Sequence, residues 1–203
     1  QTQLQDSFGM NMVALVDGQP RLLNLREMID AFVSHRREVV TRRTVFDLRK
    51  ARERGHILEG LAVALSNVDE VIALIKAAPA PADAKRELMA RTWVSPLVRE
   101  MLDRSSADQY RPEGLGADFG LKAEGYRLSD EQAQAILELR LQRLTGLEQD
   151  KLAKEYDELC RTIDRLRAIL ADPKLLLDVI MKELEDIKTR FNDHGQTREI
   201  DFR

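Results

Sequence analysis

The fold is decided by residues 25–65, which read LREMIDAFVSHRREVVTRRTVFDLRKARERGHILEGLAVAL. Apolar side chains recur in this stretch at mixed spacings of three and four, which is the period of a helix with one apolar face. Asn24, with Glu27 three residues later, is typical of a capping box at a helix start. No proline interrupts the pattern before Pro79. The pattern therefore predicts one helix over residues 25–75, roughly 75 Å long at 1.5 Å per residue, which must pack along its length or project as an arm.

A second long helical pattern follows the middle of the chain. Leu152, Tyr156, Leu159 and Ile163 recur at alternating spacings of four and three, as in a coiled coil. Asp172-Pro173 interrupts this pattern, and a last helix is expected to end near Phe191. Two long helices separated by a compact segment predict a mainly α fold: an antiparallel two-helix coiled-coil arm with a helical globular tip.

Shorter elements are expected at the N-terminus and in the tip. Asp17-Gly18 lies between two apolar runs and predicts a small β-hairpin. Four prolines and four glycines fall between residues 79 and 127, with room for short helices at 82–90 and 96–103. Ser129, with glutamine three residues later, predicts another helix start. Trp93 is expected to anchor the core of the tip.

The apolar stripe lapses at KARERGH, residues 50–56, which contains Gly55. Glycine inside a helix costs about 1 kcal/mol relative to alanine. This lapse indicates a bend, or a change from rod-like to globular packing, and a hinge in the arm would be expected near Arg52 to Gly55.

Composition fits helical rods better than an all-β domain, because aromatic residues make up 5% and charged residues 33%. The 203 residues suffice for one or two domains, and the net charge of −3 argues against uniform binding to a polyanion. Charge is uneven: residues 35–54 hold eight Lys/Arg against three acids, and residues 148–190 hold eleven acids against nine bases. This asymmetry modestly favours pairing of the outgoing and returning helices.

Two groups of residues are candidates for function. Arg36, Arg37, Arg42 and Arg43 could contact DNA phosphates, or they could solvate the arm and pair with acids of the returning helix. The second group is an apolar run that one narrow coiled-coil seam does not require. Its members could cover the local core or meet a second protomer; they are Ile136, Leu137, Leu139, Leu141 and Leu144.

Other chemistry finds little support in the sequence. Cys160 stands alone, which excludes an internal disulfide and favours a reducing, cytoplasmic compartment. His35, His56 and His194 lack carboxylate or cysteine neighbours at ligand spacing, so no metal site is predicted. No apolar run is long enough to span a membrane. The chain begins with Gln1 and not with methionine, which suggests a piece of a longer protein.

Several long stretches carry a family resemblance. TQLQDSFGMNMVAL (2–15), NLREMIDAFVSHRREVVTRRTVFDLRKARERGHILEGL (24–61) and SDEQAQAILELRLQRLTGLE (129–148) resemble the DNA gyrase A subunits, a family of bacterial type IIA topoisomerases. FVSHRREVVTRRT and LRLQRLTGLE favour gyrase over its paralogue, the A subunit of topoisomerase IV, which is the alternative.

The resemblance implies a role in strand passage. Residues 1–24 would end the tower domain, 25–75 would be the outgoing coiled-coil helix, and 76–146 the globular dimerisation gate. Residues 147–192 would be the return coiled-coil helix and final helix, and 193–203 a tail. The implied partners are a second copy, forming a homodimer, the gyrase B subunit and DNA, and the implied cofactors of the parent complex are ATP and magnesium. The resemblance also places the two-fold contact at Ile136 to Leu144.

No residue inherits the catalytic role of the family. Its nucleophilic tyrosine follows an arginine, whereas Tyr110, Tyr126 and Tyr156 follow glutamine, glycine and glutamate. We therefore expect this chain by itself not to cleave DNA and to have no catalytic, cofactor or metal site. Two interpretations that assign the chain to other functional classes remain open: a free-standing helical spacer or scaffold, and a nucleic-acid-binding arm.

Overall fold

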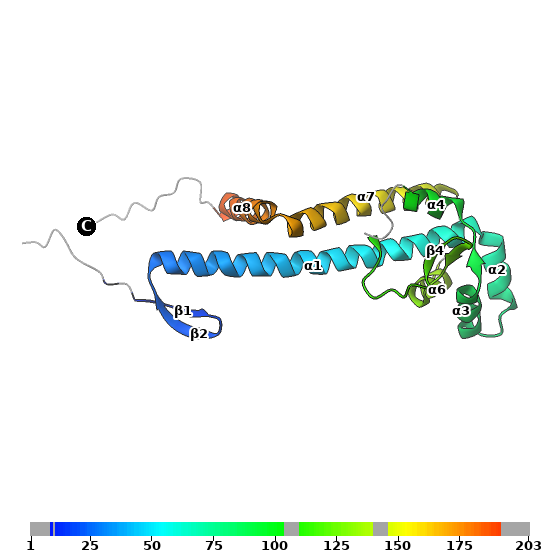
Figure 1. Ribbon diagram of the computed structural model, residues 1–203, viewed down its shortest axis with the longest axis horizontal. Helices are drawn as coiled ribbons and strands as arrows, with labels where there is room; N and C mark the ends of the chain where they lie inside the picture. The colour runs from blue at the N-terminus through cyan, green and yellow to red at the C-terminus, as the bar shows by residue number, and fades with distance from the viewer. Residues whose placement is uncertain (1–8, 10, 104–109, 140–145, 192–203) are drawn as a thin grey trace, which may run out of the picture. The chain divides into compact units, whose positions relative to one another are not determined.

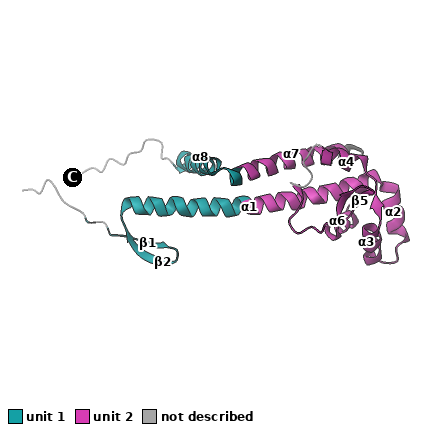
Figure 2. Ribbon diagram, viewed as in Figure 1, with its two compact units in different colours: residues 1–44, 169–203 teal, residues 45–168 magenta. Residues whose placement is uncertain are grey.

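The chain is mainly helical (Figure 1), and it divides into two compact units. The computed structural model describes residues 9, 11–103, 110–139 and 146–191. Unit 1 comprises residues 1–44 and 169–203, and unit 2 comprises residues 45–168 (Figure 2). The long first helix crosses from one unit to the other, which fits the predicted coiled-coil arm. The predicted domain boundaries themselves stay a prediction.

Unit 1 begins with the predicted β-hairpin. Strand β1 (Met12–Val16) pairs antiparallel with β2 (Gln19–Leu23). The two turn residues, Asp17 and Gly18, both have positive φ angles, 53° and 76°. A two-residue turn with both φ angles positive matches the right-handed twist of the strands, and the Asp-Gly pair tolerates it. The hairpin prediction is confirmed.

Helix α1 spans Leu25–Ser66 and begins at the predicted cap. The backbone N–H of Asn24 donates to Glu27 Oε2, and the backbone N–H of Glu27 donates to Asn24 Oδ1, both at 2.9 Å. These reciprocal bonds satisfy two backbone donors that the first helical turn leaves without partners.

The prediction of one helix through residue 75 is wrong, because α1 ends at Ser66 and α2 (Val68–Ala77) starts anew. The cause is the side chain of Asn67. Its Nδ2 donates to the carbonyl of Val63 at 2.9 Å and to the carbonyl of Val94 at 3.0 Å. In a continued helix the carbonyl of Val63 would accept from the backbone N–H of Asn67. The side chain takes that acceptor and links the helix end to the tip instead.

No helix break occurs at Gly55, which lies inside α1. A Cβ at this glycine would lie 3.3 Å from Leu159 Cδ2 and 3.8 Å from Tyr156 Cε2. The glycine therefore permits close packing of α7 (Gly146–Ala171) on α1. Of the two interpretations of the lapse in the apolar stripe, the structure supports a change to close packing, and the expected hinge near Arg52 to Gly55 stays a prediction.

Within unit 2, α1 and α7 run antiparallel. The Gln149 side chain donates to the carbonyl of Leu65, the Tyr156 hydroxyl reaches Glu59, and Leu159 lies against Gly55. Residue numbers therefore rise on one helix as they fall on the other, as predicted for an out-and-back arm.

Helix α8 (Pro173–Phe191) follows the predicted interruption at Asp172-Pro173. The Asp172 carboxylate accepts from the backbone N–H of Lys174 at 2.8 Å, which caps the new helix.

The tip of unit 2 contains the two predicted short helices and a small sheet that the sequence analysis did not predict. The helices are α3 (Pro81–Ala90) and α4 (Pro96–Asp103). The sheet has the order β3-β5-β4, with strands Thr92–Trp93, Gly125–Arg127 and Gly120–Lys122. Trp93 is 2% exposed, and its Nε1 donates to the carbonyl of Leu88 at 2.9 Å. Its predicted role as a core anchor is confirmed.

Candidate functional site

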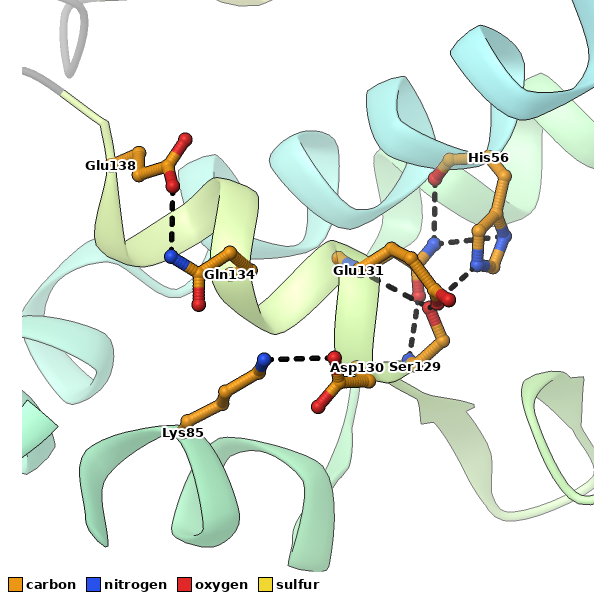
Figure 3. A network of polar contacts seen from close by, with 8 residues as sticks. His56, Lys85, Ser129, Asp130, Glu131, Gln134 and Glu138 are labelled. Carbon is orange, nitrogen blue, oxygen red and sulfur yellow. Dashed lines mark hydrogen bonds and ion pairs between the residues drawn. The ribbon is translucent and has the colours of Figure 1, made fainter. Parts of the chain in front are cut away.

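The candidate site is built on helix α6 (Asp130–Leu137), which starts at the predicted cap. The Ser129 Oγ accepts from the backbone N–H of Gln132, and the backbone N–H of Ser129 donates to Gln132 Oε1 at 3.0 Å. Lys85 on α3 pairs with Asp130 at 2.8 Å, in the first turn of α6. The cap and this ion pair, seen in Figure 3, fix where α6 begins and how it meets α3.

A buried polar network holds the first turn of α6 on α1. Gln132 is 0% exposed, and its Nε2 donates to the carbonyl of His56 at 2.6 Å and to the hydroxyl of Tyr126 at 2.7 Å. His56 Nε2 lies 2.8 Å from Ser129 Oγ (Figure 3). The Ser129 hydroxyl donates to Glu131 at 2.9 Å, so its oxygen must accept from His56. That assigns the proton of the neutral ring to Nε2 and leaves Nδ1 as an acceptor facing the Gln132 amide.

Burial sets the protonation of this network. It lowers the pKa of His56 to about 4, an effect that nearby Glu131 opposes and that Arg111 reinforces. The ring is therefore neutral at physiological pH, which fits its roles as donor and acceptor.

The contact between α6 and α1 is unusually close at Gly60. A Cβ built at this position would lie 2.7 Å from Gln132 Cβ, nearer than side-chain carbons approach one another. Gly60 thus allows the two helices to approach until the Gln132 amide reaches the α1 backbone.

The other end of α6 lies against α2 and forms an apolar groove of about 230 Å³. Its walls come from the end of α1, from α2, and from the end of α6 with the residues just after it: Ala64, Val68, Val71, Ile72, Ile75, Lys76, Ile136, Leu137 and Leu139. Val68, Ile72 and Ile75 are half-buried, as are Leu137 and Leu139. The groove therefore presents partly exposed aliphatic side chains around a single lysine.

The five predicted interface residues have different places. Ile136 is 3% exposed and belongs to the hydrophobic core. Leu137 and Leu139 pack against that core and keep part of their surface at the groove. Leu141 and Leu144 lie outside the described residues. Ile136 thus serves the core of its own chain, and the groove is where Leu137 and Leu139 could meet a partner.

The four predicted DNA-contacting arginines lie on α1 in unit 1. Arg36 Nη2 lies 2.5 Å from Glu183 Oε2 on α8, and Arg43 pairs with the other oxygen of the same carboxylate. Arg42 pairs with Glu38 one turn away at 3.5 Å, and Arg37 is exposed. Pairing with an acid of the last helix is therefore observed for two of the four.

Sequence reasoning did not find the buried network or Glu183. The spacing of His56, Glu59 and Gly60 places all three on neighbouring turns of α1. This spacing was the one sequence feature that could have indicated that the three residues share a packed face. The two tyrosine partners of Glu59 lie 67 and 97 residues away.

In the part of the chain that the structure describes, no group of three or more His, Cys, Asp or Glu side chains could hold a metal ion. No described helix is both long and apolar enough to cross a membrane.

Comparison with known proteins gives consistent matches over most of the chain. The family model for the A subunit of DNA gyrase and topoisomerase IV matches residues 1–185. The DNA gyrase A subunit of Pseudomonas aeruginosa is 60% identical over 197 residues, which cover 97% of this chain and 21% of that protein. The DNA gyrase A subunit of Neisseria gonorrhoeae is 56% identical over 198 residues, which cover 97% of this chain and 22% of that protein. The DNA gyrase A subunit of Escherichia coli is 60% identical over 156 residues, which cover 77% of this chain and 18% of that protein. The chain spans about a fifth of the length of these curated relatives.

Proposed function

The chain belongs to the family of DNA gyrase and topoisomerase IV A subunits, and from this premise we propose that it is the coiled-coil arm and lower dimerisation gate of a gyrase A subunit. The relatives named above are all DNA gyrase A subunits, which favours gyrase over topoisomerase IV. In the whole protein the arm would support ATP-dependent supercoiling by strand passage, with the gyrase B subunit, DNA, ATP and magnesium. The chain itself would form a homodimer in the cytoplasm and would not cleave DNA.

The observation that carries the proposal is the groove between α2 and α6 in unit 2. It lies in the segment inserted between two antiparallel helices, α1 and α7, which are suited to an arm. Its aliphatic side chains are partly exposed in the single chain, so a second copy could bury them. A two-fold contact is isologous, which means that the groove of one protomer would meet the same groove of its partner.

The area of such a contact should suit a gate that opens. The groove is small and its central residues already serve the core, so the contact would fall below the large obligate class of interfaces. We therefore expect a reversible dimer whose population depends on concentration.

Light scattering of the 23.2 kDa chain over a concentration series tests the proposal. A mass that rises toward twice the chain is expected, and a Leu139→Glu variant should remain monomeric. Leu121→Glu is the matched control, because Leu121 is a 37% exposed leucine of the same unit outside the groove. Burial of Trp93, followed by its fluorescence, verifies that each variant folds.

Cysteine cross-linking adds a positional test. In a Cys160→Ser background, a cysteine near a two-fold axis can form a disulfide with its own copy if the Cα atoms approach within about 7 Å. Leu139→Cys should cross-link and Leu121→Cys should not. Monomers at every concentration together with equal, low cross-linking of both variants would contradict the gate.

A further inference from the structure

Glu59 on α1 joins three elements through its carboxyl group. Its Oε2 lies 2.6 Å from the hydroxyl of Tyr126 on β5, and its Oε1 lies 3.1 Å from the hydroxyl of Tyr156 on α7. Both tyrosines are buried, with 1% and 2% of their surface exposed. A carboxyl group held between two buried phenols is an uncommon arrangement, since such a group is usually exposed or paired with a cation.

The direction of the hydrogen bonds at Oε2 is fixed by Gln132. The amide Nε2 of Gln132 can donate and cannot accept, and it donates to the oxygen of Tyr126 at 2.7 Å. The single hydroxyl hydrogen of Tyr126 is then directed at Glu59 Oε2. This oxygen accepts whether the carboxyl group is ionised or neutral.

The direction at Oε1 is not fixed in this way. The Tyr156 hydroxyl lies 3.1 Å from Oε1, and it also interacts with the thiol of Cys160, one turn further along α7, and lowers the pKa of that thiol. If Glu59 is ionised, Tyr156 must donate to Oε1. If Oε1 carries a proton, it donates to Tyr156, whose own hydrogen can then go to the Cys160 sulfur. The chain from Gln132 to Cys160 then runs in one direction, and every donor has one acceptor.

We propose that Glu59 is a proton-operated latch between α1 and α7: in the neutral form its carboxyl group stays packed against Tyr156 of α7, and in the ionised form the cost of burying the charge favours release of α7. The latch is internal to unit 2 and does not depend on the proposed gate. The neutral form holds more tightly because it places no charge among the buried phenols.

The surrounding groups place the transition in an accessible pH range. Burial raises the pKa of Glu59 to about 6, against the lowering effects of the hydrogen bonds from Tyr126 and Tyr156 and of the Arg111 cation. The raised pKa means that the stabilising effect is complete below the ordinary pKa of 4.5 and is lost as pH rises through 6.

Three other titratable groups of this cluster, His56, Cys160 and Tyr126, do not change charge in the same range. His56 on α1 is held neutral, because burial lowers its pKa to about 4. The thiol of Cys160 stays protonated, since burial and nearby acids raise its pKa to about 11. Burial and the Glu59 charge also keep the Tyr126 hydroxyl protonated by raising its pKa. On α6, Glu131 faces His56 and the Ser129 hydroxyl.

The first test is the titration of Glu59 in the full chain labelled with 13C at glutamate carboxyls. One resonance, identified by its loss in Glu59→Gln, should titrate near pH 6. Tyr156→Phe should raise this midpoint, because the ionised carboxylate loses a donor that stabilises it. A midpoint at the ordinary value near 4.5, unchanged in Tyr156→Phe, would overturn the latch.

The second test is hydrogen exchange of the α7 amides around Tyr156, corrected for the intrinsic effect of pH. The opening equilibrium in the wild type should increase on the order of tenfold between pH 5 and pH 7.5, as a carboxyl with pKa about 6 in the fold and 4.5 when released requires. Glu59→Gln carries an amide that can donate to Tyr156 as the neutral acid does. At both pH 5 and pH 7.5, the opening equilibrium of this variant should be as low as that of the wild type at pH 5.

Glu53→Gln is the matched control. Glu53 lies on the same helix with 46% of its side chain exposed, and it pairs with Lys50. This variant should keep the pH dependence of the wild type. The latch would be refuted if Glu59→Gln kept that dependence, or if the wild type showed none.

Discussion

The two halves of α1 belong to one continuous helix but are packed differently. In residues 25–44, which lie in unit 1, only Val40 and Thr44 are buried, and Leu25, Ile29 and Phe32 are 64%, 53% and 47% exposed. In residues 45–66, which lie in unit 2, Val45 and Phe46 are still about half exposed, but Leu48 and Ala51 are buried and the apolar face from Leu58 onward joins a core shared with α6 and α7. An amphipathic pattern therefore predicts a helix but does not say how closely its apolar face is covered.

Residue size distinguishes the two halves better than hydrophobicity does. The second half is rich in small residues on its packed face: Ala51, Gly55, Gly60, Ala62 and Ala64. Small side chains let neighbouring helices approach, so the packing depends on individual atoms. The first half carries large apolar residues, and ion pairs of Arg36 and Arg43 with Glu183 link it to α8.

The largest difference between the halves should come from truncating one aliphatic side chain in each. Leu58 is 1% exposed and Ile29 is 53% exposed. Leu58→Ala should lower the free energy of unfolding by about 2–5 kcal/mol, because it leaves a cavity in the core. Ile29→Ala should change it by less than about 0.5 kcal/mol, as a surface substitution does. Urea unfolding followed by Trp93 fluorescence measures the first, and circular dichroism measures both. Equal losses would mean that the two halves are equally covered.

The next effect is the pH dependence that His56 gives to unit 2. Burial lowers its pKa from 6.5 to about 4 in the fold, so its contribution is present above pH 6.5 and is lost as pH falls toward 4. That loss would reach roughly 3 kcal/mol if the whole shift acted on unfolding. Glu59 acts in the opposite direction between pH 4.5 and 6, so the two partly cancel in the wild type. Urea unfolding at several pH values should therefore show a steeper acid loss in Glu59→Gln than in the wild type.

His56→Gln is the complementary variant. It should remove the His56 contribution, so that the stability of unit 2 relative to the wild type improves as pH falls from 6.5 to 4. A difference between wild type and variant that stays constant over this range would show that the ring is not buried in its neutral form.

Local signals in the sequence predicted most of the helices and their ends. The capping boxes of Asn24 with Glu27 and of Ser129 with Gln132 both form. The hairpin at Asp17-Gly18 and the interruption before Pro173 were also predicted correctly, because each depends on neighbouring residues. The helix end at Ser66 was missed because Asn67 acts through a contact with Val94, far along the chain.

The candidate site was less predictable, because its contacts join distant segments. No local pattern indicates that Glu59 meets Tyr126 and Tyr156, or that Gln132 crosses to His56. The three-stranded sheet was missed for a similar reason, since its strands are two or three residues long and too short for a pattern of alternation. The predicted dimer contact at Leu137 and Leu139, and the DNA contacts of the four arginines, stay predictions.

Two glycines of the packed half give a finer comparison. Gly60→Ala places a Cβ 2.7 Å from Gln132 Cβ, so α6 must move and the buried network must adjust. We expect a loss of about 1–3 kcal/mol, typical of overpacking. Gly55→Ala meets the flexible end of Leu159 at 3.3 Å, and alanine gains about 1 kcal/mol in helix propensity. It should be neutral or slightly stabilising in thermal unfolding. If Gly60→Ala were also neutral, the approach of α6 to α1 would be looser than the structure shows.

The smallest effect should come from the ion pairs of the first half. Glu183 is shared by Arg36 and Arg43, whose side chains are 23% and 47% exposed, and Glu183 itself is 30% exposed. Arg36 Nε is buried and has no hydrogen-bond partner in the described part of the chain, so the guanidinium relies on Glu183 to offset its lost hydration. Glu183→Gln should therefore cost unit 1 about 1 kcal/mol at low salt.

That cost can be separated from a general effect of removing one negative charge. Glu38→Gln breaks the Arg42 pair, whose side chains are 69% and 63% exposed, and it should change stability by less than about 0.3 kcal/mol. Hydrogen exchange at Ile180, the buried residue of α8, reports unit 1 without involving the core of unit 2. Raising the salt concentration to about 1 M shortens the Debye length to about 3 Å and should shrink the Glu183 effect. An effect that salt leaves unchanged would show that Glu183 acts by packing, which would make the two halves of α1 more alike than their charges indicate.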